Sequence, residues 1–164
     1  MKTIASLGGG LAGACAVTLL HESVRRVVPK APRIDLLGMN AISKGLNAAG
    51  IKTPTGNKLY TLALAGDILS NSMYYALAGT GNEKNIWLKS SMLGLAAGVA
   101  AITLPGPMGL NEKHSARSPE TKLMTVALYV AGALVATGIM KLLAKRKHQR
   151  HEEWERRLVT SAMG

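Results

Sequence analysis

An aspartate and three other polar side chains share one face of an apolar segment. Between residues 59 and 79, Asp67 is followed at helical spacing by Ser70, Asn71 and Tyr74. These side chains would lie near the middle of a segment long enough to cross a membrane. An ionised carboxylate at that depth costs about 2.5–3.5 kcal/mol on insertion scales. Two hypotheses follow: a proton, cation or polar-solute site, or an interhelical hydrogen-bond node that fixes packing.

A second group with side chains capable of acid–base or metal chemistry ends the first apolar segment. His21 and Glu22 are followed by Arg25 and Arg26, which Glu22 can pair with at i+3 and i+4. An acid–base or metal role would need a further partner, and no residue at a fixed spacing supplies one. The zincin pattern fails because no second histidine follows at the required position. We interpret the group as a charged cluster at headgroup depth, and we expect no catalytic residues, metal or cofactor.

These residues are carried by a chain whose charges are segregated. The 164 residues include 20 Lys and Arg against 9 Asp and Glu, a formal net charge of +11. Four windows hold one formal charge among them, that of Asp67; the windows are residues 3–21, 59–82, 90–111 and 123–140. The pattern favours a small polytopic membrane protein over a disordered chain, a disulfide scaffold or a coiled coil.

The expected fold is an all-α bundle of four transmembrane helices within a membrane domain of residues 1–144. We predict the spans at about 3–20, 59–79, 86–104 and 122–143. Residues 34–49 have apolar positions at i, i+3, i+4 and i+7 but are too polar to span. They are predicted to form an amphipathic helix in the interface plane. Residues 145–164 are expected to form a basic, helical cytoplasmic tail.

Small residues recur at four-residue spacing within the expected spans. The candidate packing residues are Gly9, Gly13, Gly94, Gly98 and Gly132. Membrane helices associate by close backbone approach, which small side chains allow. Internal packing of the bundle is the favoured use, and oligomerisation through one of these faces is the alternative.

Basic residues flank the spans and suit an anionic membrane surface. The candidate contacts to lipid headgroups are Arg25, Arg26, Lys145, Arg146 and Lys147, at about 1 kcal/mol for each charge close to the surface. No array of aromatic residues for stacking bases accompanies them, so nucleic acid is not an expected partner. Lys and Arg are equally numerous on the two sides, so the orientation rests on the dense tail. The tail predicts both termini in the cytoplasm, with dual topology as the alternative.

Four blocks of the sequence resemble a group of known proteins. They are GACAVTLLHE (13–22), APRIDLLGM (31–39), AGDILSNSMYY (65–75) and LPGPMGL (104–110). Together they resemble small uncharacterised bacterial membrane proteins with four predicted spans. The resemblance covers most of the chain and implies a location in the bacterial inner membrane. It implies no activity for any residue.

Three functional hypotheses remain open. The favoured one is a non-enzymatic subunit or scaffold of a membrane assembly, either a homo-oligomer or a complex with other membrane subunits. The alternative is a small channel or transporter that uses the polar face around Asp67. The third is a membrane enzyme that acts on lipid, which lacks a second catalytic group beside His21 or Asp67.

Overall fold

The computed structural model of the chain is helical throughout, with short connections. It describes residues 3–81 and 83–162, without the side chains of residues 83, 147–148, 151–155 and 157–162. In chain order the helices are α1 (Thr3–Val27), α2 (Ile34–Ala48), α3 (Gly56–Ala76), α4 (Ile86–Thr103), α5 (Lys113–Ala116) and α6 (Pro119–Ala162). Two 3-10 turns, η1 (Leu77–Gly79) and η2 (Glu83–Asn85), join α3 to α4. The described range contains no strand.

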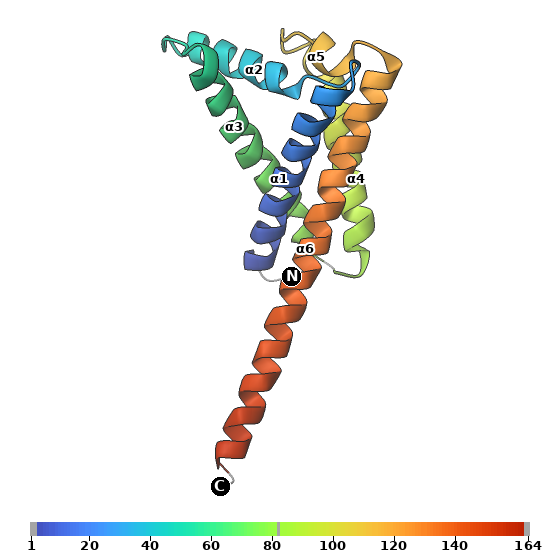
Figure 1. The fold of residues 1–164 in the computed structure, drawn as a ribbon. Helices are drawn as coiled ribbons and strands as arrows, with labels where there is room; N and C mark the ends of the chain where they lie inside the picture. Colours follow the sequence, from blue (N-terminus) through green and yellow to red (C-terminus); the bar gives the residue numbers. More distant parts are fainter. Residues whose placement is uncertain (1–2, 82, 163–164) are drawn as a thin grey trace.

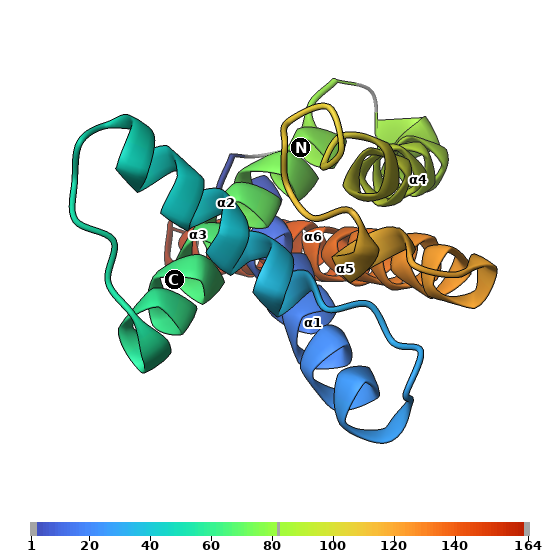
Figure 2. The same ribbon diagram turned by 90° about the horizontal axis from the view of Figure 1, so that it is seen from above.

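Four long helices alternate in direction along the molecule (Figure 1). α1 and α4 run toward one end and α3 and α6 run back, so the start of α1 lies at the end from which α6 projects. α2 and α5 lie at the opposite end, where α2 crosses over α1 and α3 (Figure 2). α6 packs extensively on α1 and α4, whereas α3 packs mainly on α1 and α2. α3 therefore stands at the edge of the group.

Three of these helices are long and apolar enough to cross a membrane. They are α1, α4 and the part of α6 between Pro119 and Arg146. α3 is not among them, because polar residues such as Asp67 and Asn71 lower its mean hydropathy. Its 21 residues span about 30 Å at 1.5 Å per residue, which is long enough to cross. The fourth expected span therefore stays a prediction.

The helix ends differ from the expected spans where the chain becomes charged. α1 continues past Leu20 to Val27 and ends before Pro29, whose ring cannot continue a helix. α6 begins at Pro119, where the Ser118 hydroxyl accepts a hydrogen bond from the backbone N–H of Thr121 at 3.2 Å. From there α6 runs unbroken from the expected span into the expected tail.

Candidate functional site

One face of α1 is closed against α6 by glycines. A Cβ added to Gly13 would lie 2.6 Å from both the Gly132 carbonyl oxygen and the Ala136 Cβ. A Cβ added to Gly9 would lie 2.6 Å from the Ala136 carbonyl oxygen. Separations this short leave no room for a side chain, so the two backbones touch. We call this contact, through Gly9, Gly13 and Gly132, the closed seam.

Glycines also allow the backbones of α4 and α6 to come into contact. A Cβ added to Gly94 would lie 2.8 Å from the Val130 Cα, and one on Gly98 would lie 2.6 Å from the Val126 Cα. All five candidate packing glycines thus lie between helices of one chain. A second copy cannot use them without displacing α6.

The other face of α1 meets α3 closely at only one end. There Gly10 lies against the backbone of Ser72 and Ala76, and Gly79 of η1 lies against Ser6. Toward the α2 end the two helices diverge, and α2 covers the gap (Figures 1 and 2). The result is a cavity between α1, α2 and α3, which we call the wedge cavity. The space in it that is open to water is about 30 Å³, enough for about two water molecules.

The wedge cavity has an acidic lining. Its polar residues are Thr18, His21 and Glu22 from α1, Asp35 from α2, and Tyr60 and Asp67 from α3. No Lys or Arg is among the described residues that line it. Arg25 and Arg33 lie beside this lining and pair with Glu22 and Asp35.

Asp67 is held on the α3 wall by two donors. The Thr18 hydroxyl donates to Oδ2 at 3.2 Å and the Asn71 side-chain amide donates to Oδ1 at 3.0 Å. Asp67 forms no ion pair with any residue whose side chain is described. Its carboxyl group is therefore positioned by neutral hydrogen bonds and has no cation beside it.

The other two residues of the predicted polar face point elsewhere. Ser70 is exposed, and its hydroxyl donates to the backbone carbonyl of Asp67 within α3 at 3.1 Å. The Tyr74 hydroxyl donates to the backbone carbonyl of Leu93 on α4 at 3.0 Å. Of the four residues of that face, the structure brings together Asp67 and Asn71, and it adds Thr18 from α1.

His21, which the sequence analysis assigned to a charged cluster at headgroup depth, lines the wedge cavity. It is 6% exposed, and neither ring nitrogen has a hydrogen-bond partner in the protein. The ring packs edge-on against Tyr129 of α6, with 5.6 Å between ring centroids. A neutral imidazole has one donor and one acceptor to satisfy, and buried polar groups are nearly always paired.

A sequence signal for His21 does exist. Gly10, Ala14, Thr18 and His21 follow one another at spacings of four, four and three residues, which places them on one helix face. The series becomes visible only when α1 is carried past Leu20. Ending the helix there assigned His21 to a headgroup cluster instead.

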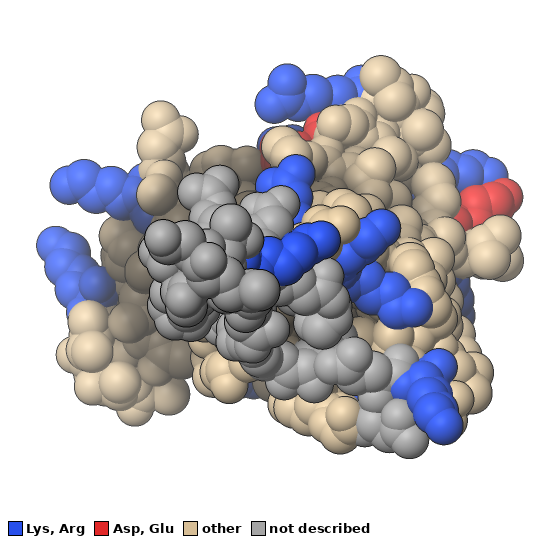
Figure 3. All heavy atoms as spheres, turned by 90° about the horizontal axis from the view of Figure 1, so that it is seen from below, with Lys and Arg blue, Asp and Glu red and all other residues tan. Residues whose placement is uncertain are grey.

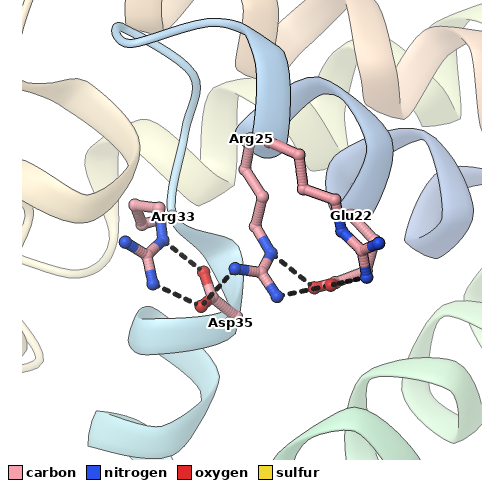
Figure 4. Close-up of polar contacts among 5 residues, drawn as sticks. Glu22, Arg25, Arg33 and Asp35 are labelled. Atoms are coloured by element: carbon pink, nitrogen blue, oxygen red, sulfur yellow. Dashed lines mark hydrogen bonds and ion pairs between the residues drawn. The ribbon is translucent and has the colours of Figure 1, made fainter.

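A chain of ion pairs closes the α2 end of the wedge cavity (Figure 4). Arg25 donates from Nε to Glu22 Oε1 at 2.8 Å, and its Nη1 lies 3.8 Å from Asp35 Oδ2. Arg33 donates to both oxygens of Asp35, at 2.9 and 2.7 Å. Burial alone would raise the pKa of Asp35, but the hydrogen bonds from Arg33 and the charges of Arg33 and Arg25 lower that pKa below its ordinary value. Both carboxylates of this chain therefore already have cationic partners.

α2 is also tied to the connection between α4 and α6. The Lys44 ammonium donates to the backbone carbonyl of Met108 at 2.6 Å, and the backbone N–H of Arg33 donates to the carbonyl of His114 at 2.7 Å. The Asn40 side chain accepts from the backbone N–H of Asn111 at 3.0 Å. The helix expected to lie in the interface is thus fastened to the protein as a cover over the wedge cavity.

The residues expected to contact lipid headgroups lie at both ends of the molecule. Arg25 is turned inward to Glu22 and Asp35, whereas the Arg26 side chain is 74% exposed. Lys145 and Arg146 are exposed where α6 projects, and Figure 3 shows Lys and Arg side chains gathered around that helix. The side chain of Lys147 lies outside the described residues.

The wedge cavity does not have the composition of a metal centre. Within the part of the chain that the structure describes, no three His, Cys, Asp or Glu residues are placed to hold a metal ion. What the site offers is a carboxyl group and an imidazole in a small space that water can enter. No protein-family model, curated protein or solved structure matches this chain.

Proposed function

We propose that this chain is a small membrane transporter that binds a proton, a cation or a small polar solute in the wedge cavity. The observation that carries the proposal is the lining of that cavity, which includes the carboxyl group of Asp67, held by Thr18 and Asn71 and without an ion-pair partner among the described side chains. Ionisable groups are expensive inside a membrane, and where they occur they commonly mark ion pathways.

The proposal includes α3 as a fourth membrane-crossing helix. α3 lies antiparallel to α1, and its most polar side chains, Asp67 and Asn71, bond to one another and to Thr18 rather than facing lipid. That arrangement lowers the cost of placing α3 in the bilayer. Four crossings put both termini on one side, and the basic projecting end of α6 favours the cytoplasm of a bacterial inner membrane for that side.

The contacts below the wedge cavity support a carrier rather than an open pore. Gly10 against Ser72 and Ala76, and Gly79 against Ser6, close the α1–α3 contact at the end opposite α2. The cover formed by α2 and its ion pairs lies at the other end of the cavity. Transport would require the lower contact and the α2 cover to open in turn, which is a form of alternating access.

Flux measurements on the reconstituted protein test the proposal. The purified chain is placed in liposomes, and uptake of protons, alkali cations and small polar solutes is compared with that of empty liposomes. We expect Asp67→Asn to reduce flux to the level of empty liposomes while the protein remains folded. Ser70→Ala is the matched control, because it removes a hydroxyl one turn away that lies outside the cavity. Wild-type protein that moves none of these species would contradict the proposal.

A second function, as a subunit of a membrane assembly, is favoured by α6. This helix continues as a single rod beyond the other helices (Figure 1). A lone helix with polar residues on all sides is marginally stable in water, so it suits contact with another chain or with anionic headgroups. The mass of the purified particle in nanodiscs, with all co-purifying chains identified, tests this candidate. Other chains at fixed stoichiometry would support it, and a lone monomer would contradict it.

A further inference from the structure

We propose that the species bound in the wedge cavity is a proton, taken up by the carboxyl group of Asp67 at the oxygen that faces Thr18. The use of this proton in transport rests on the proposed function. The site itself rests on the hydrogen bonds of the Asp67 carboxyl group and on the small space that this group lines, with no cation bonded to it among the described side chains.

The two oxygens of the Asp67 carboxyl group have partners of different kinds. Oδ1 accepts a hydrogen bond from the side-chain amide of Asn71 at 3.0 Å, and an amide N–H can only donate. Oδ2 lies 3.2 Å from the hydroxyl oxygen of Thr18, and a hydroxyl donates or accepts according to how its hydrogen is turned. Oδ2 is therefore the oxygen that keeps its hydrogen-bond partner whether or not it carries a proton.

Protonation of Oδ2 needs the reversal of one hydrogen bond. In the ionised state the Thr18 hydroxyl donates to the carboxylate of Asp67. A proton that adds to Oδ2 forms one O–H bond, and this new hydroxyl then donates to the Thr18 oxygen. The Thr18 hydrogen turns to a backbone carbonyl of the preceding helical turn, a bond that threonine hydroxyls make within helices. No other covalent bond forms or breaks, and no group is oxidised or reduced.

Among the described side chains, no Lys or Arg bonds to Asp67. The titratable groups that line the cavity with it are His21 and Glu22 of α1, Asp35 of α2 and Tyr60 of α3, and Tyr75 of α3 and Tyr129 of α6 lie within range of its charge. The two other acids pair with Arg25 and Arg33, and the histidine nitrogens have no partner in the protein. Neutral donors compensate a buried carboxylate less well than a cation does, so uptake of a proton is the remaining way to remove its charge.

Asp35 provides an internal comparison, because it is the only other aspartate in the chain. It accepts hydrogen bonds from Arg33 at 2.9 and 2.7 Å and lies 3.8 Å from Arg25. Although burial raises the pKa of Asp35, the bonds from Arg33 keep that pKa below its ordinary value. Asp67 has two neutral donors in place of two arginines, so we expect the two carboxyl groups to change charge in different pH ranges.

The small size of the cavity favours a proton over a larger ion or a solute. Hard cations such as Mg²⁺ and Ca²⁺ take about six or more oxygen ligands. The open space is about 30 Å³, or about two water molecules, and an N–H donor already occupies Oδ1 of Asp67. A proton needs one lone pair of Oδ2 and no added space.

The test follows the protonation of Asp67 directly. Carbon NMR of the full chain in nanodiscs, with the aspartate side-chain carboxyl carbons labelled, reports on both aspartates, and Asp67→Asn assigns the two signals. We expect the Asp67 signal to change from protonated to ionised between about pH 5 and pH 9, while the Asp35 signal stays that of a carboxylate. An Asp67 that is ionised throughout this range, or protonated throughout, would overturn the inference in the wild-type protein without any other variant.

Variants of the two donors test which oxygen takes the proton. Asn71→Leu removes a donor that stabilises the ionised form, so we expect the proton affinity of Asp67 to rise about tenfold. Thr18→Val removes a partner that serves both forms and should change the affinity less, and Ser70→Ala should leave it unchanged. An equal rise in Thr18→Val and Asn71→Leu would mean that Thr18 stabilises only the carboxylate, and would overturn the placement of the proton at Oδ2.

Liposome flux separates this inference from the proposed function. Titration of Asp67 without flux of any species would support the proton site and contradict the transport function. Flux of an alkali cation or a solute through a protein whose Asp67 stays ionised would support transport and overturn the proton. Proton flux that is lost in Asp67→Asn would support both.

Discussion

The two faces of α1 contrast sharply. Toward α6, Gly9 and Gly13 bring the backbones into contact along the closed seam, with no room for another atom. Toward α3, Gly10 makes an equally close contact at one end, but the same face continues through Thr18 to His21 and opens into the wedge cavity. One helix thus holds the protein together with one face and presents ionisable groups with the other. The contrast teaches that small residues set where helices close, and larger polar residues on the same stripe set where they part.

The largest expected effect comes from breaking the closed seam. Gly13→Leu places a side chain where a Cβ alone would lie 2.6 Å from the backbone of Gly132, so α1 and α6 must separate. We expect destabilisation of more than about 3 kcal/mol, measured as loss of monodisperse protein and a lower unfolding temperature in detergent. Gly138→Ala is the control, because a Cβ there meets nothing within 4 Å. It should be neutral or stabilise by up to about 1 kcal/mol. Equal unfolding temperatures for the two variants would contradict a close backbone contact at the closed seam.

The next largest loss of stability is expected from removing a buried hydrogen bond beside the closed seam. The buried Tyr75 hydroxyl donates to the backbone carbonyl of Tyr129 at 3.0 Å. Tyr75→Phe leaves that carbonyl without its side-chain donor and should cost about 1 kcal/mol of unfolding free energy. Tyr74→Phe, which removes a similar bond from a less buried tyrosine, should cost less. The reverse order in thermal unfolding would show that burial does not set the cost.

The open face should tolerate an apolar substitution. His21→Leu exchanges a ring with two unpartnered nitrogens for a side chain that needs no hydrogen bonds. We expect a stability within about 1 kcal/mol of the wild type, because the substitution removes no hydrogen bond to the protein. A loss as large as that of Gly13→Leu in the same unfolding assay would mean that His21 is a packing residue.

The smallest expected effect concerns Asp35 in α2, the cover of the wedge cavity. It appears as a change in how the unfolding free energy depends on pH. Because the pKa of Asp35 is lowered in the folded protein, its ion pairs stabilise the fold at neutral pH. That contribution is lost as the pH falls below about 4 and then through the lowered pKa of Asp35. We expect less than about 1 kcal/mol, since Arg33 is partly exposed. Unfolding free energy measured against pH should fall less steeply on acidification in Asp35→Asn. Identical slopes would contradict this role for Asp35.

The sequence predicted the helical class and the position of most helices, because segregated charge and hydropathy depend on local composition. It ended α1 at Leu20, since Glu22 and Arg25 are too polar for a span. In the structure these residues stay helical with the i+3 pair of Glu22 and Arg25, and Arg25 also lies 3.8 Å from Asp35 of α2, a contact that no local pattern reveals. The fourth span at α3 stays a prediction for the same reason: its polar residues are satisfied by α1, a contact far away in the sequence.

The candidate site was predicted only in part. Helical spacing grouped Asp67 with Ser70, Asn71 and Tyr74, but it could not show that α1 lies on the side of Asp67 and α4 on the side of Tyr74. His21 was treated as an interfacial residue because the cavity that it lines is completed by α2 and α3, which lie elsewhere in the sequence. Periodicity fixes which residues share a face, and tertiary packing decides which part of that face meets a cavity.

The contrast between the two faces of α1 can be tested most directly by the reactivity of cysteines toward a small water-soluble thiol reagent in membranes. In a Cys15→Ser background, Leu64→Cys places a thiol in the wall of the wedge cavity, where the native residue is half-buried, and Ala133→Cys places one in the dry core, where the native residue is fully buried. We predict that the thiol at position 64 reacts and that the thiol at position 133 does not. Equal protection of both positions would contradict a water-accessible cavity between α1 and α3.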